Sequence, residues 1–384
     1  MKLAVYTDYV YRRAGDTVYA ERAFALFLAA LAPHVDRLVL IGRLAPQAGQ
    51  ARYPLPPDVE LAPLPHYSSL ADPGAALGAL ARSVRHIWRA LDDVDVLWAL
   101  GPYPHAIVLV AVALCRRRSV VLGVRQDWPS YVRRRRPGRR WMHFSADVLE
   151  RIWRMLAHRF PVVAVGPELT AHYAHAPDVL ELVVSLVPAE QIERPAAVRD
   201  YDGELSILSV GRLDEEKNPL LLADVLALLH QRDARWRLRV CGEGDLAGAL
   251  SRRLAERGLA DRAELLGYVP VGEELFELYR SSHALLHVSW TEGFPQVLVE
   301  AFASGLPVVA TDVGGVRVGV GDAAIVVPPG DPEAAADGLR RLAGDANLRA
   351  RLTAAGLEQA TDLTLEAQIG RLAEFLSAAR TDSA

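Results

Sequence analysis

Two glutamates, Glu292 and Glu300, are separated by seven residues in a segment that begins where an apolar run ends. The run 284–288 is typical of a buried strand, and Pro295 suits the first turn of a helix because the N–H that proline lacks is not needed there. Glu292 would then lie in the loop before the helix, and Glu300 in its second turn. The free N–H groups around 294–297 favour an anion. The segment therefore suits a ligand with phosphates and hydroxyls, such as a sugar nucleotide.

The alternative interpretation of these glutamates is structural. Glu292 would be an acid at the start of a helix, and Glu300 a solvated helix residue. The next segment favours ligand binding, because the apolar run 305–310 leads into the turn 312–315 with its two glycines. This arrangement would bring a second glycine-rich loop to the same helix.

A second group of polar residues, at 209–219, also follows an apolar run. Gly211 would let a ligand approach the backbone. Arg212, as a planar fork, and Lys217, as a compact charge, could both contact a diphosphate and stabilise it as a leaving group. Lys217 is notable because Lys2 is the only other lysine among 43 basic residues. The alternative is a surface pair beside the acids at 214–216.

The elements that would position these residues alternate in the way that is typical of parallel α/β folds. Helices are expected near 17–32, 74–91, 104–115 and 139–158, and later near 218–231, 246–257, 273–281, 295–303, 332–343 and 364–379. Strands are expected at 3–6, 37–41, 94–99, 119–124 and 161–165, and then at 205–210, 237–241, 263–266, 284–288, 307–310 and 324–327. The two series meet in a polar stretch at 188–203, which contains Pro188, Pro195 and Gly203.

The second half of the chain, roughly 203–345, resembles the family 4 retaining glycosyltransferases. The residues that carry the resemblance are Gly211-Arg212 with Lys217, the segment at 267–270, and the pair Glu292 and Glu300. The resemblance implies a GT-B fold, with two Rossmann-like domains facing each other across a cleft. It implies domains at 1–187 and 204–363, a linker at 188–203, and a last helix within 364–384 that returns to the first domain.

The resemblance also implies residue roles. Arg212 and Lys217 would hold the diphosphate, Glu300 the ribose hydroxyls and Glu292 the donor sugar. The remaining donor contacts would come from Gly211, Val269, Gly293, Phe294, Pro295, Gln296, Val297 and Leu298.

The first half departs from the family pattern. Where the family often has a Gly-Gly loop after the first strand, this chain has a loop with Gly15 and Asp16, and then Glu21 and Arg22, which are expected on a helix. The family's histidine at the end of a later strand is missing. Arg125, Asp127 or His105 could take its place on the acceptor side, although a lone histidine such as His105 is more often a turn or core residue.

The run Arg133–Arg140 is the strongest local concentration of charge. It could bind anionic lipid headgroups or a phosphorylated acceptor, or it could be a solvated loop before a helix. We expect the nearby aromatic residues Trp141, Trp153 and Phe160 to lie in the core.

The overall composition limits the classes of function. A net charge of -4 argues against a general nucleic-acid binder. Cys115 and Cys241 show no metal or redox spacing, which is typical of a cytoplasmic protein. No segment has the composition of a signal peptide or a membrane span. The expected location is cytoplasmic, with peripheral contact at the inner face of the membrane as the alternative.

The sequence therefore predicts a hexosyltransferase that uses a nucleoside-diphosphate sugar, with UDP favoured over GDP, and a hydroxyl acceptor. The resemblance to the family implies that transfer retains the anomeric configuration. The acceptor could be a lipid, a glycan or a small metabolite. No metal or other cofactor is expected, because the Asp-X-Asp pairs, at 93–95 and 200–202, lie before a strand or in the linker. The alternatives are a GT-B sugar-nucleotide epimerase and a noncatalytic subunit that binds a nucleotide sugar.

Overall fold

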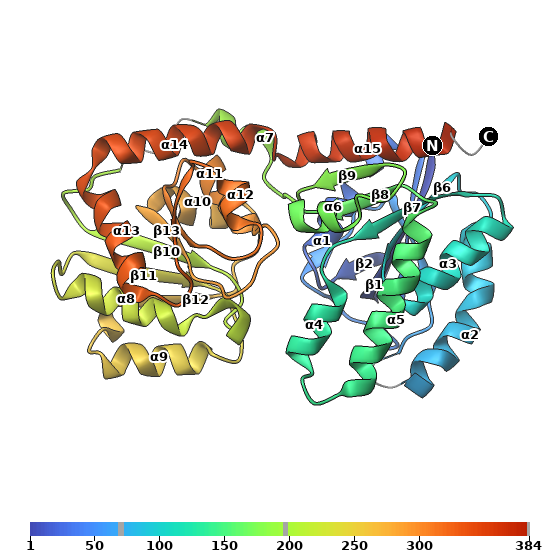
Figure 1. Cartoon of the computed structure of the whole chain (residues 1–384), viewed down its shortest axis with the longest axis horizontal. Helices are drawn as coiled ribbons and strands as arrows, with labels where there is room; N and C mark the ends of the chain where they lie inside the picture. Colours follow the sequence, from blue (N-terminus) through green and yellow to red (C-terminus); the bar gives the residue numbers. More distant parts are fainter. Residues whose placement is uncertain (68–72, 195–198, 382–384) are drawn as a thin grey trace. The chain divides into compact units, whose positions relative to one another are not determined.

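The computed structural model describes residues 1–67, 73–194 and 199–381 (Figure 1). The chain divides into two compact units. Unit 1 comprises Met1–Val184 together with Gln368–Ala384, and unit 2 comprises Ser185–Ala367. Each unit has its own sheet and its own hydrophobic core. The long helix α15 (Leu365–Thr381) begins in unit 2 and continues into unit 1.

The sheet of unit 1 is parallel apart from the pairs β1–β2 and β2–β4. Its central path runs β4-β2-β1-β6-β7-β8-β9, with β3 beside β1 and β5 beside β3. Strand β7 is buried along its whole length because helices cover both faces of such a sheet. The strands are β1 (Lys2–Ala14), β2 (Thr17–Ala20), β3 (Arg37–Leu44), β4 (Tyr53–Pro54), β5 (Val59–Leu64), β6 (Val96–Gly101), β7 (Ser119–Val124), β8 (Val162–Val165) and β9 (Val179–Leu182).

The helix expected at 17–32 is wrong in its first part. Residues Thr17–Ala20 form β2, which pairs with the end of β1, and α1 begins only at Phe24. Gly15, with φ of 59°, and Asp16 form the two-residue turn between the strands. A positive φ at this turn suits a hairpin, and the β-branched and aromatic residues that follow favour a strand. Glu21 and Arg22 therefore lie in the bend before α1 and not on a helix.

The helices expected near 74–91, 104–115 and 139–158 are present, whereas those at 128–135 and 167–172 had no counterpart among the expected elements. Trp153 and Phe160 are buried as predicted, but Trp141 is 43% exposed. The expectation that Trp141 lies in the core is therefore wrong. The α-helices are α1 (Phe24–Ala29), α2 (Pro73–Ala90), α3 (Pro104–Cys115), α4 (Trp128–Arg135), α5 (Arg140–Ala157) and α6 (Pro167–His172).

The six strands of unit 2 are all parallel, in the order β12-β11-β10-β13-β14-β15. Alternate strand residues pack with α8, α9 and α13 in one core, while α10 and α11 contact β10 and β14. The strands are β10 (Leu205–Val210), β11 (Trp236–Cys241), β12 (Ala263–Gly267), β13 (Ala284–His287), β14 (Val308–Thr311) and β15 (Ala324–Val327). The α-helices are α7 (Ala189–Glu193), α8 (Leu220–His230), α9 (Ala247–Glu256), α10 (Glu273–Ser281), α11 (Gln296–Ala303), α12 (Val316–Val320), α13 (Pro332–Gly344) and α14 (Ala346–Thr361).

Two parts of unit 2 add to the sequence-based picture. The stretch 188–203, expected as a linker, contains the short helix α7, and its Pro195 lies outside the described residues. Helix α14 had no counterpart among the expected elements. Its leucines Leu348 and Leu352 complete the core on which α13 packs.

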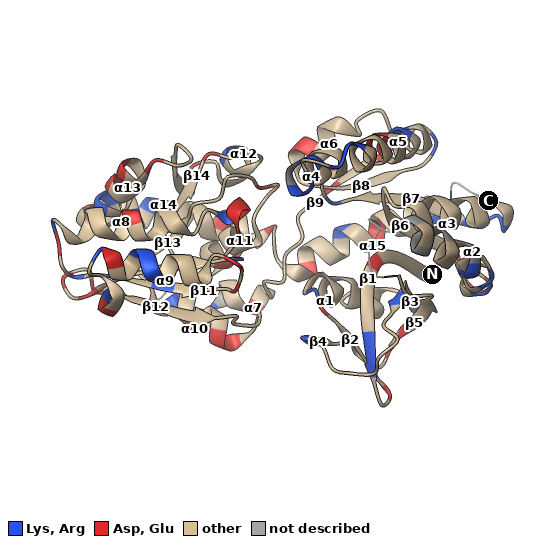
Figure 2. Ribbon diagram, turned by 90° about the horizontal axis from the view of Figure 1, so that it is seen from below, with Lys and Arg blue, Asp and Glu red and all other residues tan. Residues whose placement is uncertain are grey.

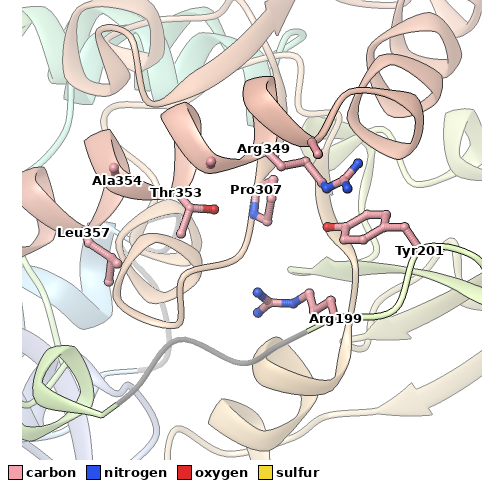
Figure 3. Close-up of a pocket in the computed structure, with 9 residues that line it drawn as sticks. Arg199, Tyr201, Pro307, Arg349, Thr353, Ala354 and Leu357 are labelled. Atoms are coloured by element: carbon pink, nitrogen blue, oxygen red, sulfur yellow. The ribbon is translucent and has the colours of Figure 1, made fainter.

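A pocket of about 380 Å³ opens at the end of the unit 2 sheet where the strands begin (Figure 3). Its lining includes Tyr201, Pro307 and Arg349, and the Arg349 guanidinium lies 3.8 Å from the centre of the Tyr201 ring. Arg199, at the same pocket, donates to the carbonyls of Ser282 (2.6 Å), Gly305 (2.8 Å) and Ser304 (3.1 Å). These carbonyls follow the last residues of α10 and α11, so Arg199 caps both helices.

Replacing Arg199 with alanine should lower the free energy of unfolding by about 2 kcal/mol, because the helix-end carbonyls would lose a charged donor. Urea titration followed by circular dichroism would measure the change. The exposed Arg252 provides a matched control, and its replacement should leave stability nearly unchanged. An equal loss in both variants would contradict the capping role.

Candidate active site

The carboxylate of Glu292 is the centre of the site in unit 2. Its Oε1 accepts hydrogen bonds from the Lys217 ammonium, from Ser289 Oγ at 2.7 Å and from His287 Nε2 at 2.9 Å. The Glu292 side chain is 9% exposed and that of Lys217 is 24% exposed. Lys217 follows β10 and Glu292 follows β13, and these strands are neighbours in the sheet. The two segments singled out from the sequence therefore meet in a direct ion pair.

Opposing effects determine the protonation of Glu292. Burial raises the pKa of its carboxyl, but the hydrogen bond from His287 and the charge of Lys217 outweigh burial and lower the pKa to about 2. The carboxylate thus remains charged at neutral pH. Because its folded pKa lies below its ordinary value, Glu292 stabilises the fold above about pH 4.5, and this contribution is lost as pH falls towards 2.

The variant Glu292→Gln should be less stable than the wild type by about 3 kcal/mol at pH 7, since a pKa unit corresponds to about 1.4 kcal/mol. The difference should shrink as pH falls from 4.5 to 3. Urea unfolding across this pH range would measure it. Glu204, whose side chain is 56% exposed, is the control position for Gln substitution. A difference that stays constant with pH would contradict the assignment.

Close backbone contacts hold the loop around Glu292. A Cβ at Gly314 would lie 1.8 Å from the Glu292 carbonyl oxygen, so only glycine fits there, and its φ is 52°. The Gly315 N–H donates to Gly293 O at 3.0 Å. The glycine-rich turn after β14 thus lies against the backbone that carries Glu292.

The loop after β10 is positioned in the same way. Trp290 N–H donates to Glu216 O at 2.8 Å, which joins this loop to the one that carries Glu292. A Cβ at Gly242 would lie 1.8 Å from Gly211 O, whereas one at Gly211 would meet nothing within 4 Å. The space beside Gly211 is therefore open to a ligand.

Arg212 differs from Lys217 in its contacts. Its guanidinium pairs with Asp214 and, at 2.8 Å, with Glu216, and its side chain is 49% exposed. These are the surface pairs that the alternative interpretation predicted. Arg212 contacts acids of its own loop, while Lys217 reaches across to Glu292. The ion pair that joins the two segments is therefore that of Lys217 with Glu292.

Glu300 is buried, with 3% exposure, and not the solvated helix residue of the structural alternative. Its Oε2 accepts a hydrogen bond from the hydroxyl of Tyr279 at 2.6 Å. Burial raises the pKa of the Glu300 carboxyl, and the Tyr279 bond opposes the rise.

The start of α11 has no side chain that caps it. Pro295 occupies the N-cap position with ψ of 128°, one residue before the first turn in which it was expected, because its backbone is still extended. Gln296 and Val297 begin the helix, and the Leu298 N–H already donates to Pro295 O at 3.1 Å. The Phe294 ring packs on Gly319 of α12. Gly293, like Gly211, has open space where a Cβ would be.

Val269 lies just after β12 and lines a pocket of about 460 Å³ with Arg239, Leu266 and residues of α10. The segment before it is turned by Gly267, whose φ of 70° favours glycine. Val269 is thus at the strand-end side of the sheet, where one of the predicted donor contacts would be made.

Sequence reasoning missed two polar residues of this site. His287 is the last residue of β13 and bonds Glu292, and Thr311 at the end of β14 donates to Ser289 O at 2.8 Å. The signal was available, since polar residues that end otherwise apolar strands gather at one edge of a parallel sheet.

The acceptor-side candidates belong to unit 1 and lie in separate settings. Gly15 and Asp16 form the exposed hairpin turn. Asp127 caps α4 by accepting from the Ser130 N–H at 3.1 Å. The Arg125 guanidinium lies 3.6 Å from the centre of the Phe24 ring and donates to the Tyr9 hydroxyl.

His105 belongs to a buried polar cluster. It is 1% exposed, stacks on Tyr67 and lies 3.3 Å from Ser83 Oγ. Burial and the charge of Arg43 lower its pKa to about 4, so the ring is neutral at pH 7. Asp8, which the sequence analysis missed, accepts from the Tyr67 hydroxyl at 2.5 Å, and Arg43 donates to Asp8 O at 2.6 Å. Burial raises the pKa of the Asp8 carboxyl.

Within the described residues, no group of three or more His, Cys, Asp or Glu side chains is arranged to hold a metal. None of the described helices combines the length and apolar composition that crossing a bilayer requires.

Most of unit 2 matches a known protein family. Residues 190–359 match the family described as "Glycosyl transferases group 1". This stretch, which is less than half of the chain, is similar to the group 1 glycosyl transferases. The resemblance to glycosyltransferases that was predicted from Lys217, Glu292 and Glu300 is thereby confirmed.

Curated relatives are similar over part of the chain. The D-inositol 3-phosphate glycosyltransferase of Corynebacterium diphtheriae is 31% identical over 225 residues, which are 53% of this chain and 52% of the relative. That of Frankia alni is 37% identical over 172 residues, 42% of each chain. The chain thus spans about half the length of the curated relatives it matches.

Solved structures are similar over almost the whole chain. A crystal structure of Anabaena HepE in complex with UDP superposes with a TM-score of 0.71 at 19% identity, covering 98% of this chain and 100% of that one. Sucrose-phosphate synthase from Thermosynechococcus elongatus gives a TM-score of 0.72 at 18% identity, with 99% and 100% covered. The prediction of a GT-B fold with two Rossmann-like domains is confirmed.

Proposed function

We propose that this protein transfers a hexosyl group from a nucleoside-diphosphate sugar, UDP-linked in preference to GDP-linked, to a hydroxyl acceptor. The observation that carries the proposal is the ion pair between Lys217 and the buried Glu292, ahead of the uncapped start of α11. The pair brings a cation and a sugar-binding carboxylate together where an anion is favoured.

Each group has a proposed role in the transfer. Lys217 and Arg212 stabilise the departing diphosphate, which gains negative charge as the glycosidic bond breaks. Arg212 would exchange its surface acids for phosphate oxygens. Glu292 accepts hydrogen bonds from the donor sugar, and Glu300 accepts them from the ribose. The backbone at 293–298 lies along the phosphates and sugar, and the backbone of Val269 lies at the base.

The comparisons support a uridine nucleotide. Structures with the same fold include HepE in complex with UDP and with UDP-glucose. Their identity to this chain is 19% and 18%. They support UDP as the nucleotide of the proposed donor. The curated relatives are named D-inositol 3-phosphate glycosyltransferases, and this name supports a small hydroxylated acceptor over a glycan for this protein.

Three further features belong to the proposal. Transfer retains the anomeric configuration, as in the family that the chain resembles. It needs no metal, because the cations Arg212 and Lys217 neutralise the diphosphate. Peripheral contact with a membrane runs through Arg133–Arg140, and the exposed side chains beside these arginines support that contact.

Calorimetric titration with UDP and GDP tests the donor site. We expect UDP to bind more tightly than GDP, and Glu300→Ala to weaken the affinity for UDP at least tenfold. Unchanged affinity in Glu300→Ala would contradict the ribose role.

Incubation with labelled UDP-glucose tests the reaction, with and without hydroxyl acceptors such as inositol phosphate. Transfer product with the donor's anomeric configuration, seen by NMR, is the expected result. Conversion of the donor without acceptor would instead identify an epimerase. Tight binding without turnover across the acceptors would identify a noncatalytic binding subunit.

A further inference from the structure

Helix α5 carries a stripe of exposed apolar side chains. Trp141, Phe144, Val148 and Met155 are exposed by 43%, 71%, 39% and 58%. At 100° per residue, these positions fall within about 60° of arc on the helix surface. The residues that α5 buries, Ala146, Trp153 and Ala157, lie on a different face. The stripe is therefore not the side by which α5 packs on unit 1.

Arginines lie beside the stripe. Arg140, Arg151 and Arg154 are exposed on α5, next to the apolar positions around the helix. Helix α4, which packs on α5, and the turn that follows it add the basic run that begins at Arg133 (Figure 2). Arg133 pairs with Asp147 at 2.6 Å.

The charge of this region contrasts with the rest of the chain. Residues 133–159 contain nine arginines and two acids, a formal charge of +7 in a chain of net charge -4. The remaining residues therefore carry -11. An anionic surface would attract the α4–α5 region and repel much of the rest of the protein, which would orient the chain on that surface.

We propose that α4 and α5 form a docking surface for an anionic lipid bilayer, which rests on and extends the membrane contact proposed above for Arg133–Arg140. The Trp141–Met155 stripe enters the interface between headgroups and acyl chains, while the arginines contact headgroup phosphates. A soluble polyanion would use the arginines but would leave Trp141 and Phe144 in water. A partner protein with an apolar groove would not account for the excess of arginines. The combination of both features favours the bilayer.

Flotation with vesicles tests this surface in the full-length chain. We expect the wild type to bind vesicles of phosphatidylcholine with 30% phosphatidylglycerol, and to bind pure phosphatidylcholine at least tenfold more weakly. Binding should fall when salt is raised from 0.1 M to 0.5 M, because salt screens the charges. Equal binding to the two vesicle types would overturn the proposal.

Two variants separate the parts of the surface. The double variant Trp141→Ala/Phe144→Ala removes the apolar contribution to vesicle binding. The double variant Arg140→Glu/Arg151→Glu reverses the charge at two positions beside the stripe. Each should reduce vesicle binding at least tenfold. All four side chains are exposed, so the melting temperature should not change. Trp88→Ala is the matched control, since Trp88 is 47% exposed on α2 of the same unit, and it should bind as the wild type does.

Other occupants would give different results. If wild-type chains self-associate in sedimentation and the Trp141/Phe144 variant does not, with no vesicle binding by either, the stripe is an interface between copies. If inorganic polyphosphate binds and vesicles do not, the arginines form an anion site without lipid. Both results would overturn the proposal. Calorimetry with UDP should be the same in all these variants, so a failure here would not bear on the donor site.

Discussion

Replacement of Lys217 with alanine is expected to lower kcat for sugar transfer about a thousandfold, with a much smaller effect on KM. A fixed cation aimed at a leaving group acts mainly in the transition state, and loss of one such group typically costs 10²–10³ in kcat. The variant also leaves Glu292 without its ion pair, although Ser289 and His287 still donate to its carboxylate. Steady-state kinetics with UDP-glucose would measure the change.

The chain offers an unusually clean control for this experiment. Lys2 is the only other lysine, and it makes an exposed pair with Asp93 in unit 1. Lys2→Ala should therefore leave kcat and KM unchanged. Lys217→Arg tests whether charge alone suffices, and it should recover only part of the rate because the planar guanidinium cannot replace a compact ammonium. Full activity in Lys217→Ala would exclude the proposed mechanism.

Replacement of Gly314 with alanine is expected to lower the free energy of unfolding by at least about 3 kcal/mol and to abolish most activity. The added Cβ would lie 1.8 Å from Glu292 O, and alanine is strained at a φ of 52°. Relief of the clash must displace the backbone that carries Glu292. Urea unfolding and kinetics of the same preparation would measure both effects.

Gly344, at the end of α13, is the matched control for this substitution. A Cβ there would meet nothing within 4 Å, and the φ of Gly344 does not lie in the positive range that favours glycine. Gly344→Ala should be neutral or slightly stabilising. Similar losses in the two variants would mean that the contact with Glu292 O is not what makes Gly314 necessary.

The sequence predicted the fold well, because the alternation of apolar runs and amphipathic stretches is typical of parallel sheets. Strands at 119–124, 205–210 and 324–327 and helices at 104–115 and 273–281 agree with the structure to the residue. The proximity of Lys217 and Glu292 followed from their positions after two strands. Which carboxylate each cation contacts could not be predicted, since side-chain partners depend on distances of an ångström.

Unit 1 shows where local patterns are insufficient. The hairpin at 15–20 was missed because a strand of four residues is too short to show a long apolar run. Asp8 was missed because its partners Arg43 and Tyr67 are remote in sequence. Trp141 was misplaced because α5 has apolar residues on two faces, and sequence alone does not indicate which of them packs on the sheet.

The division of the chain within α15 determines how the protein can be dissected. Unit 2 is one uninterrupted stretch of the sequence. Unit 1 consists of two segments, one before unit 2 and one after unit 2 in the sequence. Gln368 accepts from the Val183 N–H at 2.9 Å, and Arg371 donates to Glu181 O at 3.2 Å. A gene fragment encoding 185–367 is therefore a natural unit for expression. A fragment ending at 184 would lack these contacts, and a version of unit 1 that folds alone would need its last helix joined by a designed linker.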